Sequence, residues 1–282
     1  MALLEPKQAL AWYASTVPGQ PTESSESGSR EGIDLGLRGR VVLVTGGVRG
    51  VGAGISDVFA RQGATVVTCA RRPVEGVRHE FHPCDVRDPD AVAGLIDHVH
   101  ERHGRLDVLV NNAGGSPHVP TAEASPRFHQ KVIELNLLGV LYASQAANAV
   151  MQHQPGGGSI VSVSSVSGRR PSPGTAAYGA AKAGVDSLTA TLAVEWAPKV
   201  RVNSVVAGMV ATEQVELFYG DADSQAAVAA TIPLGRLAQP SEIGWAAAFL
   251  ASDAASYISG ATLAVHGGGE PPAFLAASAA NK

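Results

Sequence analysis

The stretch Val41-Val-Leu-Val-Thr-Gly-Gly-Val-Arg-Gly-Val-Gly52 decides the fold of this chain of 282 residues. Its first four residues are apolar and mostly β-branched, a run too short for a helix, which predicts a buried parallel strand. Gly46, Gly50 and Gly52 follow, and the segment 53–62 has the pattern of a helix. Because backbone N–H groups at a helix N-terminus can bind a pyrophosphate, this order is typical of the first unit of a dinucleotide-binding fold. An ordinary tight turn is the alternative interpretation.

Strands and helices alternate along the rest of the chain, which predicts an α/β fold with a parallel sheet and right-handed crossovers. The expected strands are 41–44, 65–70, 80–82, 106–110, 159–164, 201–205 and 262–265. The expected helices are 53–62, 88–103, 125–151, 175–197, 213–230 and 240–252.

Composition narrows the class of protein. The chain is 45% hydrophobic with a net charge of −4, which suits a single globular domain and gives no basic surface for nucleic acid. No apolar run reaches the roughly 18 residues of a membrane span, and the N-terminus does not resemble a signal peptide. Cys69 and Cys84 are expected to be free core thiols in a reducing cytoplasm. The histidines are scattered, so no metal is expected, even where His79 and His82 alternate along a strand.

The N-terminus differs from the rest of the chain. Residues 18–32 are rich in Ser, Glu, Gly and Pro, a composition that cannot bury enough surface to order itself. We therefore expect a flexible arm over residues 1–36 and one domain over 37–282, in which 212–235 forms a substrate loop with helices. The alternative is an arm whose aromatic residues dock on a neighbouring subunit.

Tyr178 and Lys182 stand one helical turn apart, and Ser165 lies thirteen residues before the tyrosine. Residues four apart share a helix face, so the ammonium can lie beside the phenol. A neighbouring cation favours the phenolate, which makes a tyrosine usable as an acid or base near neutral pH. Taken alone, the pair could equally belong to a solvated helix face.

Several motifs in order resemble those of the short-chain dehydrogenase/reductase family, from about residue 37 to about residue 269. They are the glycine turn, Cys84-Asp-Val86, Asn111-Asn-Ala-Gly114, Asn136, Ser165, Tyr178 with Lys182, and Val202-Asn-Ser-Val-Val-Ala-Gly208 leading to Thr212. The resemblance implies a Rossmann-like, doubly wound sheet of seven strands in the order 3-2-1-4-5-6-7, and a homotetramer or homodimer. It also implies a catalytic set of Asn136, Ser165, Tyr178 and Lys182.

Charge at the end of the second strand predicts which nicotinamide cofactor binds. NAD-specific relatives carry an acidic residue there, whereas this chain has Ala70 followed by Arg71 and Arg72. Guanidinium groups can hold a 2′-phosphate, and Arg49 adds another cation, so NADP(H) is preferred and NAD(H) stays possible. With the resemblance, the expected cofactor site is Gly46, Arg49, Gly50, Val51, Gly52, Arg71, Arg72, Asp85, Val86, Asn112, Ala113, Gly114, Tyr178, Lys182, Gly208, Val210 and Thr212.

The predicted function is an NADP(H)-dependent oxidoreductase that interconverts a carbonyl and a secondary alcohol, with Tyr178 as general acid/base. Two alternatives stay open: an NAD(H)-dependent alcohol, 3-hydroxyacyl or hydroxysteroid dehydrogenase working oxidatively, and a non-catalytic protein that senses NADP. The small-molecule substrate should lie among the segments 116–121, 166–174 and 213–232. Its identity stays open among oxoacyl thioesters, steroid-like ketones and small carbonyl compounds.

Overall fold

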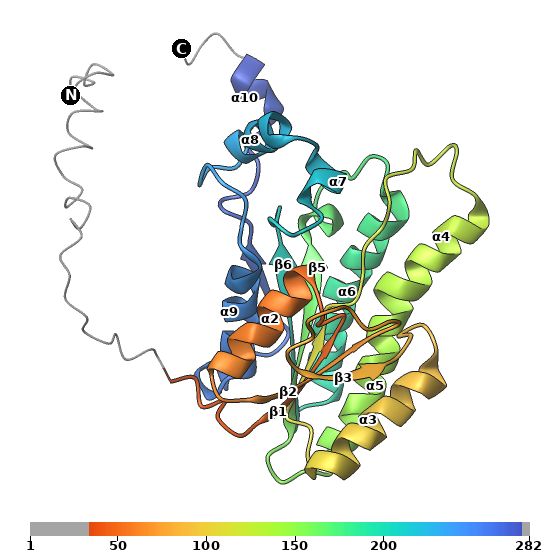
Figure 1. Cartoon of the computed structure of the whole chain (residues 1–282), viewed down its shortest axis with the longest axis vertical. Helices are drawn as coiled ribbons and strands as arrows, with labels where there is room; N and C mark the ends of the chain where they lie inside the picture. Colours follow the sequence, from red (N-terminus) through yellow and green to blue (C-terminus); the bar gives the residue numbers. More distant parts are fainter. Residues whose placement is uncertain (1–33, 278–282) are drawn as a thin grey trace, which may run out of the picture. The chain divides into compact units, whose positions relative to one another are not determined.

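A computed structural model describes residues 34–277, so nearly all of the predicted N-terminal arm lies outside the described residues. Seven parallel strands form one sheet in the order β3-β2-β1-β4-β5-β6-β7, which confirms the predicted topology (Figure 1). The strands are β1 Val41–Thr45, β2 Thr65–Ala70, β3 Glu80–Pro83, β4 Val108–Asn111, β5 Gly158–Ser165, β6 Val200–Ala207 and β7 Thr262–Val265.

Helices cover both faces of the sheet (Figure 1). They are α2 Gly50–Arg61, α3 Pro89–His103, α4 Pro126–Ile133, η1 Glu134–Leu138, α5 Gly139–Met151, η2 Val166–Gly168, α6 Ala176–Glu195, α7 Val215–Tyr219, α8 Ala222–Ala230, α9 Pro240–Ala251, η3 Asp253–Ala255 and α10 Ala273–Ala277. Within residues 34–277, none of these helices is long and apolar enough to cross a membrane.

Two hydrophobic cores lie on opposite sides of the sheet because successive side chains of a strand point to opposite faces. Val42 and Val44 of β1 pack with α2 and α9. Val41 and Leu43 of the same strand pack with α3, α5 and the end of α6. Both faces are therefore buried, as in other doubly wound sheets, and the carboxyl ends of the strands stay available for a binding site.

Two predicted helices are interrupted. The segment predicted as one helix over 125–151 consists of α4, a π-helical turn η1 and α5. The helix predicted over 213–230 is wrong as a single element, because Gly220 between α7 and α8 has φ of +80°, which a continuing helix cannot adopt. The fourth strand begins at Val108 rather than 106, because the side chain of Gln154 binds both the N–H and the carbonyl of Leu106.

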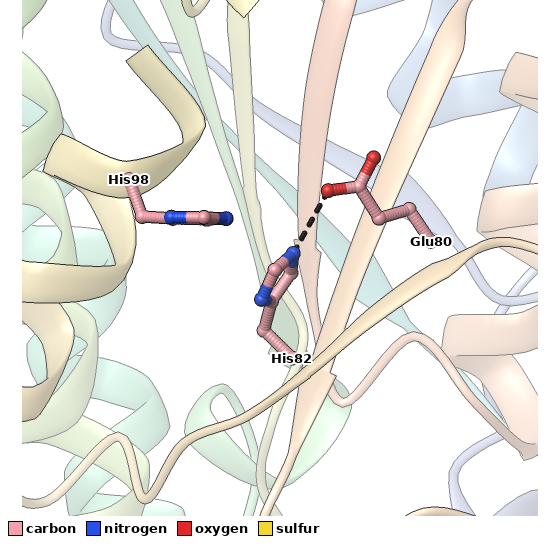
Figure 2. Close-up of side chains that lie close together, drawn as sticks. All are labelled: Glu80, His82 and His98. Atoms are coloured by element: carbon pink, nitrogen blue, oxygen red, sulfur yellow. Dashed lines mark hydrogen bonds and ion pairs between the residues drawn. The ribbon is translucent and has the colours of Figure 1, made fainter. Parts of the chain in front are cut away.

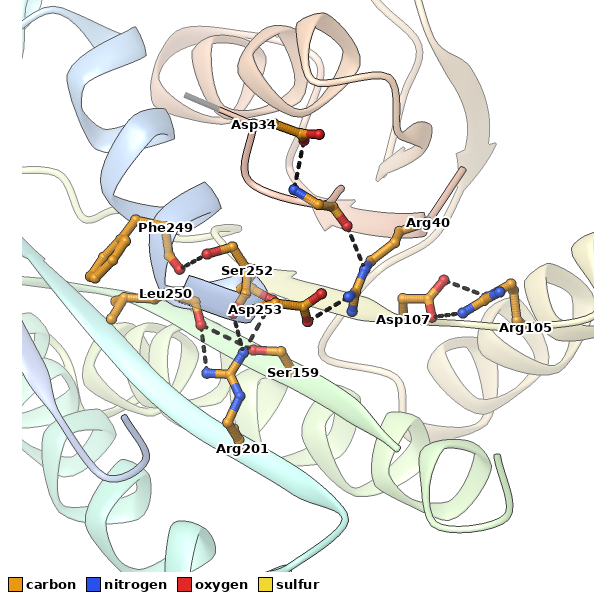
Figure 3. A network of polar contacts seen from close by, with 12 residues as sticks. Asp34, Arg40, Arg105, Asp107, Ser159, Arg201, Phe249, Leu250, Ser252 and Asp253 are labelled. Carbon is orange, nitrogen blue, oxygen red and sulfur yellow. Dashed lines mark hydrogen bonds and ion pairs between the residues drawn. The ribbon is translucent and has the colours of Figure 1, made fainter. Parts of the chain in front are cut away.

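A polar network closes the amino end of the sheet (Figure 3). The guanidinium of Arg201, at the start of β6, donates to the carbonyl oxygens of Leu250 at 2.7 Å and of Ala251, Ser252 and Ile258 at 3.1 Å. These carbonyls lie at and beyond the end of α9, where a helix leaves its last acceptors unpaired. Arg201 thus ties α9 to the sheet far from the carboxyl edge.

Candidate active site

A cavity of about 620 Å³ lies at the carboxyl ends of the strands. Its wall is built from the residues that follow β1, β2, β3, β4, β5 and β6. Such a volume is within the usual range for small-molecule sites, and the position is where open α/β sheets bind ligands.

The glycine turn fits the approach of a dinucleotide pyrophosphate. Gly46 and Gly50 have φ of +65° and +53°, which side-chain-bearing residues rarely adopt. A Cβ on Gly52 would lie 2.1 Å from the carbonyl oxygen of Gly46, so the start of α2 packs too closely for any side chain. The N-cap residue Arg49 makes no side-chain cap hydrogen bond, which leaves N–H groups of the first turn for an anion.

A carboxylate from the segment expected to border the substrate faces the glycine turn instead. Glu213 Oε2 accepts a hydrogen bond from the N–H of Gly50 at 3.1 Å. Glu213 directly follows Thr212, which also lines the cavity. The prediction of one helix over 213–230 did not anticipate this contact, because Glu213 belongs to the loop before α7.

The end of β4 is locked to the glycine turn by hydrogen bonds. Asn112 Nδ2 donates to the carbonyl oxygens of Thr45 at 3.0 Å and Gly46 at 3.2 Å. The hydroxyl of Thr45 accepts from the N–H groups of Asn112 and Ala113, both at 3.0 Å. Asn111 lies on the buried side instead, where it donates to the hydroxyls of Ser144 and Ser162. Asn112 therefore holds the glycine turn against the end of β4.

The arginines after β2 and the aspartate after β3 differ in what they contact. Arg71 lines the cavity with Arg49, whereas Arg72 does not. Asp85 is bound through both carboxylate oxygens by the guanidinium of Arg87, at 2.9 Å from Nε and 2.5 Å from Nη2. This hydrogen bonding lowers the pKa of Asp85, so its carboxylate stays ionised and is paired within the chain.

Cys69 and Cys84 are free thiols, as expected, and both are buried. Both also line the cavity, which was not expected. A hydrogen bond with Cys84, reinforced by burial, raises the pKa of the Cys69 thiol. The same hydrogen bond lowers the pKa of the Cys84 thiol, so the two thiols of the wall differ in acidity.

Tyr178 and Lys182 meet at the cavity on the first turns of α6. Lys182 Nζ lies 5.6 Å from the centroid of the Tyr178 ring and donates to the carbonyl oxygen of Val163 at 2.7 Å. Close packing allows this: a Cβ on Gly168 would lie 2.7 Å from the backbone nitrogen of Ala183. Gly168 of η2 thus lets the segment after β5 pack directly on α6.

The pKa values of this pair follow from burial. Burial lowers the pKa of Lys182 from 10.5 to about 8, although the charge of Asp186 opposes the shift. Burial also raises the pKa of Tyr178, and a hydrogen bond with Ser165 only partly offsets this. The pKa of Tyr178 is thus raised, opposite to the lowering that was expected from its neighbour Lys182.

Asn136 lies in the π-helical turn and is fully buried. Its Oδ1 accepts from the N–H of Gly115 at 2.8 Å, and its Nδ2 donates to the carbonyls of Gly115 at 3.0 Å and Val132 at 2.9 Å. A Cβ on Gly114 would lie 2.7 Å from Asn136 Oδ1 and 3.4 Å from Lys182 Nζ. Asn136 therefore fixes the loop next to Lys182 without lining the cavity, and π-turns are frequent at functional sites.

The other predicted cofactor residues lie together. The cavity is lined by Gly46, Arg49, Gly50, Val51, Gly52, Arg71, Asp85, Val86, Asn112, Ala113, Gly114, Tyr178, Lys182, Gly208, Val210 and Thr212. The three segments expected to surround the substrate also contribute, through Ser116, His118, Val166, Ser167, Arg170, Ser172, Pro173, Glu213, Gln214, Phe218 and Tyr219.

Comparison with known proteins identifies the family. A family model described as enoyl-(acyl carrier protein) reductase matches residues 46–270. This chain belongs to the short-chain dehydrogenase/reductase family, as its motifs predict. It is an oxidoreductase that acts on CH–OH donors, in a family that uses NAD(P)(H).

Three relatives illustrate the likeness. Cis-4-hydroxycyclohexanecarboxylate dehydrogenase of Sinomonas cyclohexanicum is 42% identical over 241 residues, covering 81% of this chain and 96% of the relative. The 3-oxoacyl-(acyl-carrier-protein) reductase FabG of Thermotoga maritima is 36% identical, covering 82% and 98%. The solved structure of Thermoplasma acidophilum aldohexose dehydrogenase has a TM-score of 0.79 at 34% identity, covering 83% and 95%.

Proposed function

We propose that this protein is an NADP(H)-dependent oxidoreductase that interconverts a ketone and a secondary alcohol, with Tyr178 as the general acid/base. One observation carries the proposal: Tyr178, next to buried Lys182, lines the same cavity as Ser165 and the glycine turn. A proton donor and a dinucleotide cradle in one cavity are what carbonyl reduction requires.

The side chains of this cavity suit a proton transfer at the carbonyl oxygen. A bound nicotinamide cofactor supplies or accepts the hydride. As negative charge develops on the substrate oxygen, the Tyr178 hydroxyl donates its proton to that atom, and the Ser165 hydroxyl donates a hydrogen bond that holds it in place. Because burial raises the pKa of Tyr178, the phenol keeps its proton at neutral pH and is prepared for reduction.

Lys182 and Asn136 assist in different ways. In the oxidative direction the ammonium of Lys182 favours the phenolate, because an opposite charge stabilises it. The same ammonium is suited to donate to hydroxyl groups of a ribose. Asn136 acts as a positioning residue, since its amide holds the loop at Gly115 against this end of α6.

The charges of the cavity favour the phosphorylated cofactor. Arg49 and Arg71 both line it, and Ala70 offers no carboxylate to repel a 2′-phosphate. Asp85, which also lines the cavity, is paired through both carboxylate oxygens with Arg87. We therefore place the 2′-phosphate beside Arg71.

For the substrate, we propose a ketone or secondary alcohol with an anionic substituent. The relative from Sinomonas cyclohexanicum is named for a cyclic hydroxy acid. In this chain Arg170 lines the cavity and pairs with Glu270 at 2.7 Å, so a carboxylate of the substrate would compete with Glu270 for the guanidinium.

A panel of ketones, acyl thioesters and alcohols, each assayed with NADPH, NADH and the oxidised forms, tests the proposal. We expect turnover of carboxylated cyclic compounds with a clear preference for NADP(H). Faster oxidation with NAD⁺ would favour the dehydrogenase alternative, and tight NADPH binding without turnover of any compound would favour the NADP sensor.

A further inference from the structure

A cluster of imidazole and carboxylate groups lies outside the active site, between the edge strand β3 and helix α3 (Figure 2). Glu80 and His82 are two apart on β3, so their side chains leave the same face of the strand. His98 joins them from α3, which packs along that face. One ligand atom from each residue lies within 4.8 Å of the others.

We propose that Glu80, His82 and His98 form a binding site for a divalent transition metal ion of the zinc type. Two imidazole nitrogens and one carboxylate oxygen are a set that zinc accepts, with water completing the coordination. Calcium and magnesium prefer oxygen ligands throughout, so the two imidazoles select against them.

The distances fit such an ion after small movements. His82 Nε2 lies 2.8 Å from Glu80 Oε1, and the rings of His82 and His98 meet edge to face with centroids 4.6 Å apart. Zinc bonds of about 2.0–2.1 Å at tetrahedral angles would place neighbouring ligand atoms roughly 3.4 Å apart. The exposed side chain of His98 is free to make the required rotation.

The surroundings keep the carboxylate ionised and oriented. Arg102 Nε lies 3.1 Å from Glu80 Oε1, and His103 Nε2 lies 3.2 Å from Glu80 Oε2. Arg102 contacts the same carboxylate oxygen as His82, so an ion bound at Oε1 would displace the exposed guanidinium toward solvent. A metal-bound carboxylate commonly has its second oxygen held by an outer partner, and His103 is placed to become that partner.

A buried nitrogen without a partner supports the same site. His103 Nε2 has no hydrogen bond of good geometry to any of the described residues, although it faces Glu80. Binding of an ion to Oε1 would hold the carboxylate in one orientation and leave Oε2 for His103. Sequence pattern alone does not reveal the cluster, because His98 approaches His82 only after α3 packs on the sheet.

A bound ion would join β3 to α3, and the residues that directly follow β3 in the sequence line the active-site cavity. β3 ends at Pro83, and the next residues, Cys84, Asp85 and Val86, line the large cavity. The ion would therefore stabilise the folded chain without taking part in the reaction.

Zinc binding to the full chain, freed of any histidine tag and treated with a chelator, tests this site. Calorimetric titration with zinc chloride should give one ion per chain, and zinc should raise Tm. His82→Gln and His98→Gln should each weaken binding by about tenfold or more, whereas the exposed control His153→Gln should not change it.

Further measurements control for misfolding of the variants and for zinc binding at the cysteine thiols. Circular dichroism and the metal-free Tm of both variants should match the wild type. Cobalt bound in place of zinc should give no thiolate charge-transfer band, because the proposed ligands are nitrogen and oxygen. The proposal is overturned by no uptake of zinc, by uptake that persists unchanged in both variants, or by a thiolate band that places the ion at Cys69 and Cys84.

Discussion

Lys182 Nζ lies 5.6 Å from the centroid of the Tyr178 ring and 2.7 Å from the carbonyl oxygen of Val163. Burial acts on the two residues in opposite senses, because it favours the neutral form of each. It raises the pKa of Tyr178 and lowers the pKa of Lys182 to about 8. Lys182 therefore titrates near physiological pH, whereas Tyr178 keeps its proton there.

This burial predicts a pH-dependent stability that Lys182→Met removes. Between the folded pKa of about 8 and the ordinary value of 10.5, the unfolded chain holds the lysine proton more often than the folded chain. The free energy of unfolding should therefore rise with pH, by about 1 kcal/mol from about pH 7 to 9 relative to Lys182→Met. Urea unfolding of both proteins at several pH values measures the difference, and parallel pH profiles would contradict it.

Glu213 is expected to weaken cofactor binding. Its carboxylate accepts from the N–H of Gly50, at the helix N-terminus that we assign to the pyrophosphate. Glu213→Gln removes a negative charge there and should tighten NADPH binding about two- to fivefold, as charges at helix termini contribute up to about 1 kcal/mol. Fluorescence titration measures Kd, with Glu216→Gln on α7 as the matched control. Weaker binding in Glu213→Gln alone would count against this assignment.

Arg71 and Arg72 should differ in their effect on cofactor choice. Arg71 lines the cavity and Arg72 does not, although both follow β2. Arg71→Ala should lower the ratio of kcat/KM with NADPH to that with NADH by about tenfold or more, since hydrogen bonds to charged groups contribute about 1.5–3 kcal/mol. Arg72→Ala should change the ratio less. Equal effects of the two variants would contradict the assignment of the 2′-phosphate to Arg71.

Arg201 should contribute to stability rather than to catalysis. Its guanidinium binds four carbonyl oxygens at and beyond the end of α9. Arg201→Met removes one donor from each carbonyl, although Asn203 Nδ2 still donates to Ile258 at 2.8 Å and the N–H of Ala255 to Ser252 at 3.2 Å. The variant should therefore lower the free energy of unfolding by about 1–3 kcal/mol. Arg78→Ala breaks only an exposed pair with Asp57 and should cost less than about 1 kcal/mol. Similar losses in both variants would show that the network does not act as described.

The sequence predicted the architecture well where local chemistry decides it. The apolar run at Val41 and the glycines up to Gly52 identify the first strand, turn and helix without any other information. The order of the strands depended on the family resemblance, because pairing between β1 and β4 joins segments far apart in the chain. Long-range pairing leaves no pattern that can be followed within a short window of residues.

Contacts that form only after folding could not be predicted. Asn136 continues an apolar helical pattern, so the π-turn around it has no separate signal in the sequence. The four acceptors of Arg201 come from the α9 region, some fifty residues later in the chain. Glu213 was assigned to a helix, although it belongs to the loop at the glycine turn. In each case a distant partner, rather than a neighbour in sequence, determines what the side chain does.

The kcat of Tyr178→Phe tests the central claim most directly. With the best substrate found in the panel, we expect kcat to fall by about a hundredfold or more, because the phenol supplies the transferred proton. The Kd for NADPH should stay close to that of the wild type, since the glycine turn and the arginines are unchanged. Turnover near the wild-type rate, with the cofactor bound normally, would contradict the assignment of Tyr178 as the general acid.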